Sequence, residues 1–206
     1  MAEGQRLSFR YHGKIGGIKL SLDFNVFLDH SEDFSLEDFV NFCKSIDFVV
    51  EAYPEFDFYN HTGFLPFKLF GNFLGEKIGN QWFLSGFEFY CEKNENEHSK
   101  HGKKGFFKTF FNKKEKVSES SLETAINNKN FSILMMCSSQ DSFEELTTYL
   151  FTAYLCKSCN GIFYDAFSGQ YISDFSVIES KIIQLVAELK DCHRNKQLLT
   201  HRFIKW

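Results

Sequence analysis

The sequence predicts an α+β fold, with an antiparallel or mixed sheet and helices packed mainly on one face. Strand-like and helix-like segments follow one another as hairpins and single helices, without the regular strand–helix alternation of a parallel fold. Hydrophobic residues make up 43% of the chain and charged residues 24%, which is typical of a globular protein. We expect one domain over residues 1–206, or two halves, residues 1–92 and 117–206, joined by an insert at 93–116.

A β-hairpin is predicted at the start of the chain. Residues 7–11 form its first strand, and glycines between residues 12 and 17 provide the turn. The second strand, residues 18–27, alternates strictly and so places five apolar side chains on one face. These side chains are Ile18, Leu20, Leu22, Phe24 and Val26.

The next segments predict a helix, an irregular region and a strand. Ser35 and Asp38 resemble a capping box, and apolar residues then recur at helical spacing, so we expect a helix to about Tyr53, before Pro54. Residues 57–79 are rich in Phe and interrupted by Gly and Pro, which favours a short helix and turns. Residues 81–91 have strand composition.

The second half has the clearest pattern. We expect a short helix at 118–128, a buried strand at 131–137 and a helix that begins at a capping box, Ser142 to Glu145. A hairpin follows, with strands at 162–165 and 170–172. Ser173 and Asp174 then cap a final helix with a buried stripe, and an apolar tail docks on the body. The stripe contains Ile178, Ile182, Leu185 and Leu189, and the tail covers residues 198–206.

Two cysteines three residues apart, Cys156 and Cys159, raise the question of a metal or redox site. The chain has no second C-x-x-C, and a structural zinc ion needs four ligands. The pair also falls in the last turn of the predicted helix, where the negative end of the helix dipole disfavours a thiolate. We therefore interpret both as small core residues and expect no cofactor, with the metal or redox site as the minor alternative.

Catalytic motifs are absent from the sequence. It contains neither a G-x-S-x-G elbow nor a Gly-rich phosphate loop, and His98 and His101 lie among lysines that discourage metal binding. We expect a protein that is not an enzyme, although a site scattered through the fold remains an alternative. The first eleven residues have no apolar signal region, and the chain has no apolar run of about 18 residues. These features favour a cytoplasmic protein with reduced cysteines.

Charge is distributed unevenly. The net charge is −4, but residues 93–116 hold eight Lys and three Glu, so the remainder carries −9. An acidic body with one basic insert argues against a nucleic-acid partner. In the insert, four Phe at helical spacing, Phe106, Phe107, Phe110 and Phe111, could mark an amphipathic membrane helix. We prefer a loop whose Phe side chains pack on the domain, and membrane-associated or scaffolding function is the alternative.

Five carboxylates lie within ten residues before and inside the first predicted helix. They do not follow the order of ligands in an EF-hand loop. The simplest interpretation is a solvated helix start, and the functional alternative is an electrostatic face for a basic partner. The five residues are Asp29, Glu32, Asp33, Glu37 and Asp38.

The second hairpin resembles a segment of immunity-type proteins from bacterial polymorphic toxin loci, in which it reads G-x-x-Y-D-P-Q-x-G. This chain has Gly161, Tyr164, Asp165 and Gly169, but Ala166 and Phe167 replace Pro-Gln. The likeness covers residues 131–190. It implies a cytoplasmic inhibitor that binds a cognate protein toxin and has no catalytic activity of its own. If that toxin is a basic nuclease, the carboxylates between Asp29 and Asp38 are candidate contacts.

Overall fold

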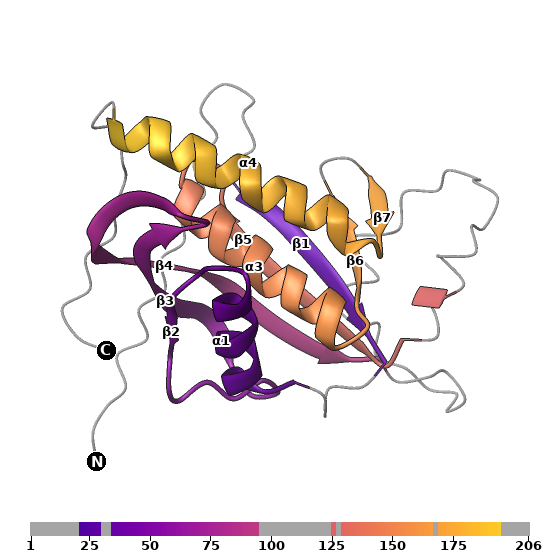
Figure 1. Cartoon of the computed structure of the whole chain (residues 1–206). Coiled ribbons are helices and arrows are strands. Elements are labelled where there is room, and N and C mark those ends of the chain that lie inside the picture. Colours follow the sequence, from indigo (N-terminus) through magenta and orange to yellow (C-terminus); the bar gives the residue numbers. More distant parts are fainter. Residues whose placement is uncertain (1–20, 30–33, 95–124, 127–128, 167–168, 195–206) are drawn as a thin grey trace, which may run out of the picture.

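A computed structural model describes residues 21–29, 34–94, 125–126, 129–166 and 169–194. Its seven strands form one antiparallel sheet in the order β2-β3-β4-β5-β1-β6-β7 (Figure 1). With the three helices described below, this confirms the predicted α+β class. The strands are β1 (Ser21–Leu28), β2 (Val50–Ala52), β3 (Thr62–Phe73), β4 (Glu76–Lys93), β5 (Phe131–Ser138), β6 (Ile162–Asp165) and β7 (Gln170–Ile172).

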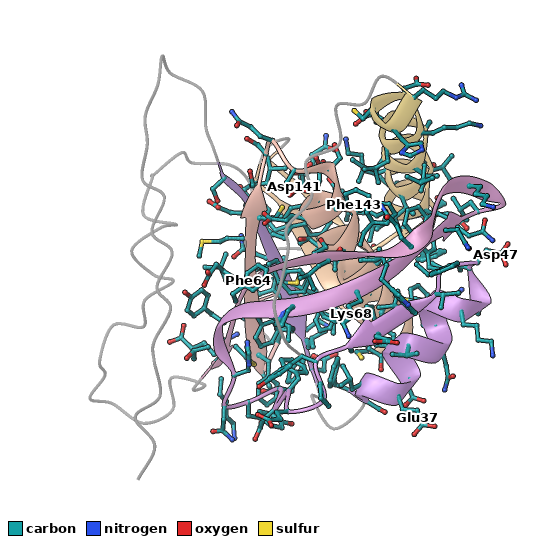
Figure 2. All side chains as sticks on the ribbon, turned by 90° about the vertical axis from the view of Figure 1, so that its left-hand side faces the viewer. Glu37, Asp47, Phe64, Lys68, Asp141 and Phe143 are labelled. Atoms are coloured by element: carbon teal, nitrogen blue, oxygen red, sulfur yellow. The ribbon has the colours of Figure 1, made fainter. Side chains whose placement is uncertain are left out.

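The helices α1 (Leu36–Ser45), α3 (Ser142–Ser158) and α4 (Phe175–Arg194) pack on the same face of the sheet. Helix α3 lies across β4, β5, β1 and β6, α4 packs beside α3, and α1 lies near β2 (Figure 1). Figure 2 shows Glu37 of α1 on the helical side and Phe64 of β3 on the opposite side of the sheet. The sheet therefore has a helical face and an opposite face without α1, α3 or α4.

Phenylalanine rings fill the space between α3 and the sheet. Phe151 of α3 is fully buried, with ring centroids 5.1 Å from Phe39 of α1 and 5.4 Å from Phe87 of β4. Phe67 and Phe89 contribute further rings from β3 and β4. A buried aromatic side chain removes a large apolar area from water, so this cluster holds α1, α3 and the sheet together.

Strand β1 confirms the predicted alternation. Leu22, Phe24 and Val26 face the helices, and β1 lies between β5 and β6. Strands from both sides of the insert thus pair directly. Residues 7–11 and 18–20, predicted to complete a hairpin, lie outside the described residues.

The first helix ends earlier than predicted. Its N-cap is Ser35, as expected, and the Ser35 hydroxyl accepts the Asp38 N–H at 3.2 Å. The helix stops at Ser45 rather than near Tyr53, because Asp47 adopts a positive φ of 60° and the Phe48 N–H returns to the Cys43 carbonyl. Residues 50–52 then pair with β3 as strand β2, so tertiary pairing overrides the apolar periodicity that predicted more helix.

Residues 57–79 are not a short helix with turns, as the sequence predicted. They contain all of β3, a strand of 12 residues that directs Leu65, Phe67 and Leu69 into the core, and the start of β4. Pro66, which favoured a turn, is tolerated because β2 pairs only with residues 67–69, so Pro66 lies at the sheet edge on that side. The alternation of side chains was present in the sequence, but the Gly and Pro residues obscured it.

The remaining elements agree closely with expectation. Strand β5, the β6–β7 hairpin and the buried stripe of α4 lie where predicted, and Asp174 accepts the Ser176 N–H at the start of α4. One cap differs: α3 begins with Asp141, whose carboxylate accepts the N–H groups of Phe143 and Glu144. Ser142 is therefore the first helical residue, since Asp141 already supplies the cap. Of the helix predicted at 118–128, only the helical residues 125–126 are described. The tail at 198–206 lies outside the described residues.

Truncation of the central ring, Phe151→Ala, should lower the free energy of unfolding by about 3–5 kcal/mol, because it leaves a cavity between α1, α3 and the sheet. Urea denaturation followed by circular dichroism measures the change. Val177→Ala on α4, where the side chain is 50% exposed, is the control and should change stability by less than about 0.5 kcal/mol. Equal effects of the two substitutions would contradict the central position of Phe151.

Candidate functional site

An open groove of about 720 Å³ lies between the start of α1 and the last turns of α3. Ser35, Asp38 and Asn41 line it from the α1 side, and Tyr154, Lys157 and Ser158 from α3. The two walls meet because Phe39 and Phe42 of α1 pack against Tyr154. The groove is therefore fixed by the core beneath it.

Tyr154 joins the two walls. Its ring is 1% exposed, its hydroxyl donates to the Ser35 carbonyl, and the Ser35 N–H donates back to that hydroxyl, both at 3.2 Å. Burial raises the pKa of Tyr154 to about 12, so the phenol stays protonated at neutral pH. The hydrogen bonds hold the N-cap of α1 against α3, which makes Tyr154 a structural group rather than a reactive one.

The groove presents mixed charge. Asp38 and Glu37 lie in the first turn of α1, where the helix dipole stabilises carboxylates, and Glu37 points to solvent in Figure 2. On the opposite wall the Lys157 ammonium lies 4.6 Å from the centroid of the Phe175 ring and 5.7 Å from that of Phe42. Such a surface can bind polar and charged side chains of a partner. Its Asp, Lys and Tyr are not joined by a hydrogen bond that would activate a nucleophile.

Three of the five carboxylates predicted as a partner-binding patch lie among the described residues, and their surroundings differ. Asp29 accepts a hydrogen bond from Lys129 at 2.7 Å, while Asp38 lines the groove and Glu37 precedes it in the first turn of α1. Glu32 and Asp33 lie outside the described residues. The structure thus separates Asp29, which has an internal partner, from the two carboxylates on α1.

Lys129 is an almost buried cation at the junction of three segments. Its residue is 6% exposed, and its ammonium donates to the Asp29 carboxylate and, at 3.3 Å, to the Asn160 carbonyl. The adjacent Asn130 donates its side-chain amide to the Asp29 carbonyl at 2.8 Å. These contacts join the end of β1, the start of β5 and the turn after α3. They give Asp29 a role in the fold.

The Cys156 and Cys159 pair is buried at the end of α3, and the described residues include no group of three or more His, Cys, Asp or Glu arranged for a metal ion. Cys156 lies in the last turn of α3 and Cys159 is its C-cap, and both thiols are buried. Burial raises the pKa of Cys156 to about 12. All six cysteines are free thiols.

The hairpin residues shared with immunity-type proteins have structural roles here. A Cβ on Gly161 would lie 2.9 Å from both Val26 and Leu28, so only glycine allows this approach of the α3–β6 turn to β1. Gly169 adopts a φ of 68° and its N–H donates to the Asp165 carbonyl at 2.8 Å, which closes the turn. Tyr164 stacks near Tyr171 across the hairpin, at 4.8 Å. None of these four residues lines the α1–α3 groove.

Sequence reasoning missed Tyr154 and Lys157 as groove residues. The only sequence signal was their spacing of three on one helix, which puts both on the same side near its C-terminal end. Their partners in α1 lie more than 100 residues earlier, so no local pattern could indicate the groove.

Comparisons with family models, curated protein sequences and solved structures found no match. Within the described part of the chain, no helix is both long and apolar enough to cross a membrane. The functional argument therefore depends on the groove and on the charge of the surfaces.

Replacement of Asp29 by Asn should destabilise the protein by roughly 2–3 kcal/mol, because the buried Lys129 ammonium loses its charged acceptor. Urea denaturation measures this. The matched control is Glu37→Gln, which should change stability by less than about 0.5 kcal/mol. The double variant Asp29→Asn, Lys129→Met should recover part of the loss, and failure to recover any of it would mean that the ion pair is not the cause.

Thiol labelling with Ellman's reagent at pH 8 should find one fast thiol. Cys192 on α4 and Cys91 on β4 are both partly exposed, but burial raises the pKa of Cys91, like that of Cys156, to about 12 and also raises those of Cys43 and Cys137. A buried protonated thiol reacts slowly because the thiolate is the nucleophile. Cys192→Ser should abolish fast labelling, and unfolding in urea should release the other five. A second fast thiol in the Cys192→Ser variant would contradict the buried arrangement.

Proposed function

We propose that the protein is a non-catalytic cytoplasmic inhibitor of the immunity type, which binds a cognate bacterial toxin and neutralises it. The observation that carries this proposal is the open groove between α1 and α3, with Glu37 and Asp38 in the first turn of α1. A concave surface with fixed walls can receive an anchoring side chain of a partner protein. The likeness of the second hairpin to immunity-type proteins supports the same class.

Charge favours a basic partner. Outside residues 93–116 the chain carries −9, and two of the carboxylates in this count, Glu37 and Asp38, lie in the first turn of α1. Opposite charges accelerate the encounter of two proteins and contribute to specificity. A toxin that acts on nucleic acid has a basic active-site region, because it must attract phosphates. An acidic inhibitor covers such a region without any chemistry of its own.

The described side chains favour binding over catalysis. The thiols with shifted pKa values are protonated at neutral pH, and Tyr154 serves to hold α1. Glu145, whose pKa is raised by burial, forms an ion pair with Lys181 at 3.5 Å between α3 and α4. Each of these groups has a packing role. The groove is the surface that is left for recognition on the helical side.

Co-expression with a toxin encoded directly upstream of this chain tests the class. The chain should restore growth, and the purified pair should form a stoichiometric complex. A housekeeping protein in that genomic position, with no complex, would overturn the proposal.

Charge reversal tests the surface. Glu37→Lys with Asp38→Lys should slow association with that toxin about tenfold at low salt, and the difference should shrink at high salt as screening increases. The matched control reverses two exposed carboxylates on α4, Glu179→Lys with Glu188→Lys. Unchanged association kinetics for the α1 variant would remove this edge from the interface.

A further inference from the structure

The face of the sheet opposite the helices carries a continuous set of large apolar side chains. The strand registers place Phe64 and Phe70 of β3, Trp82 of β4, and Leu134 and Met136 of β5 on this face. Of the residues that the structure describes, α1, α3 and α4 all pack on the other face. We call this surface the open face and define it by the side chains of Phe64, Phe70, Trp82, Leu84, Tyr90, Leu134, Met136 and Phe27.

Exposure differs along the open face. Trp82 is 43% exposed at the β3–β4 end, whereas Leu134 and Phe27, nearer the centre, are each 8% exposed. Phe27 packs with Ile162 and with Ile126, and Ala125 and Tyr164 border the same small cluster. Residues 125–126 therefore lie on the open face, and eight residues, 117–124, separate them from the end of the insert at 93–116.

Carboxylates accompany the apolar side chains. In the register, Met136 of β5 lies between Glu88 of β4 and Asp23 of β1, and Glu92 follows on the same side of β4. Tyr90 donates its hydroxyl to Glu88 at 3.2 Å, and Ser21 donates to Asp23 at the same distance. The described lysines on this side, Lys68 and Lys77, lie toward the β2 edge and the β3–β4 turn, and Lys68 pairs with Glu51. The centre of the open face is therefore apolar and negative.

The chain between β4 and β5 has the complementary composition. Residues 103–114 contain five Lys, four Phe and no acidic residue. The preceding strand ends at one end of the sheet, where the Asn94 N–H donates to the Asn130 carbonyl at 2.6 Å, and the chain returns on the open face at residues 125–126.

Length permits the contact. Eight residues, 95–102, separate Asn94 from Lys103, so these two residues can lie up to about 30 Å apart, whereas the distance from β4 across β5 to β1 is about 10 Å. The segment can therefore reach Met136 and Leu134 without displacing any described element.

We propose that residues 103–114 dock on the open face in the native chain, with their Phe side chains against Leu134, Met136 and Tyr90. Their Lys side chains lie against Asp23, Glu88 and Glu92. The docked segment forms a second apolar layer on the sheet, separate from the α1–α3 groove, and the inference does not depend on the proposed toxin. Buried apolar area contributes more to this contact than the exposed ion pairs do.

Limited trypsin digestion of the full chain, read by mass spectrometry, tests the docking. Trypsin cleaves after lysine, so the five lysines of residues 103–114 report on the state of the segment. In the native chain they should be cut at least about tenfold more slowly than in a synthetic peptide of residues 98–118, because cleavage needs local opening. Cleavage at the rate of the free peptide would overturn the proposal.

Two sets of variants assign the cause of protection. Replacement of the four Phe in residues 106–111 by Ser should remove it, and Asp23→Lys with Glu88→Lys should weaken it, with a recovery toward wild type at high salt. The control, Glu179→Lys with Glu188→Lys on α4, should leave cleavage unchanged. Thermal unfolding checks that each variant is folded. Full protection in both the Phe and the Asp23/Glu88 variants would overturn the proposal.

A second copy of the chain or a membrane would give a different result in the trypsin experiment. A second copy of the chain would make protection rise with protein concentration, whereas an intramolecular contact is independent of concentration. Membrane binding would leave the lysines fast-cleaved in buffer and protect them only with vesicles of phosphatidylserine and phosphatidylcholine. Either result would overturn docking within the chain.

Discussion

The structure depends on the burial of α3 between the sheet and α4. Helix α3 is apolar on most of its circumference, and its buried side chains contact four strands on one side and both other helices elsewhere. A helix of this kind belongs in the centre of a domain. Once it lies across β4, β5, β1 and β6, the positions of α1 and α4 follow, because each covers apolar surface that α3 and the sheet leave exposed.

Central burial of α3 also decides what its polar side chains can do. Thr147 donates to the Phe143 carbonyl and lies 2.8 Å from Ser85 Oγ of β4, so a hydroxyl pair is satisfied within the core. The exposed residues of α3, Lys157 and Ser158, lie in its last turn, where Tyr154 and Lys157 meet α1. Most of the preceding turns are buried and stabilise the fold.

Sequence patterns predicted the elements whose local signals agree with their tertiary setting. Strand β1 and helix α4 lie as expected. Each buries a single face, so its apolar residues recur with the period of a strand or of a helix. The predictions for residues 46–52 and 57–79 were wrong because the local pattern there disagrees with the tertiary setting. Apolar residues before β2 continue a helical period, and Pro66 interrupts the strand pattern of β3. Pairing of β3 with β2 and β4 nevertheless makes both segments strands. The α1–α3 groove could not be predicted either, since its walls are brought together by Phe39, Phe42 and Tyr154 rather than by any local motif.

The edges of the sheet argue for recognition by side chains rather than by added strands. Both edge strands, β2 and β7, have three residues, and β3 carries Pro66 where it extends beyond β2. Short edges and proline offer few backbone groups to an incoming strand. Among the surfaces that the structure describes, the α1–α3 groove and the open face are therefore the candidates for side-chain contacts with a partner. These surfaces suit different ligands: the groove presents mixed charge, and the open face is apolar and negative around Met136. The composition of residues 103–114 matches the second surface, so docking of that segment would leave the groove as the site for another molecule.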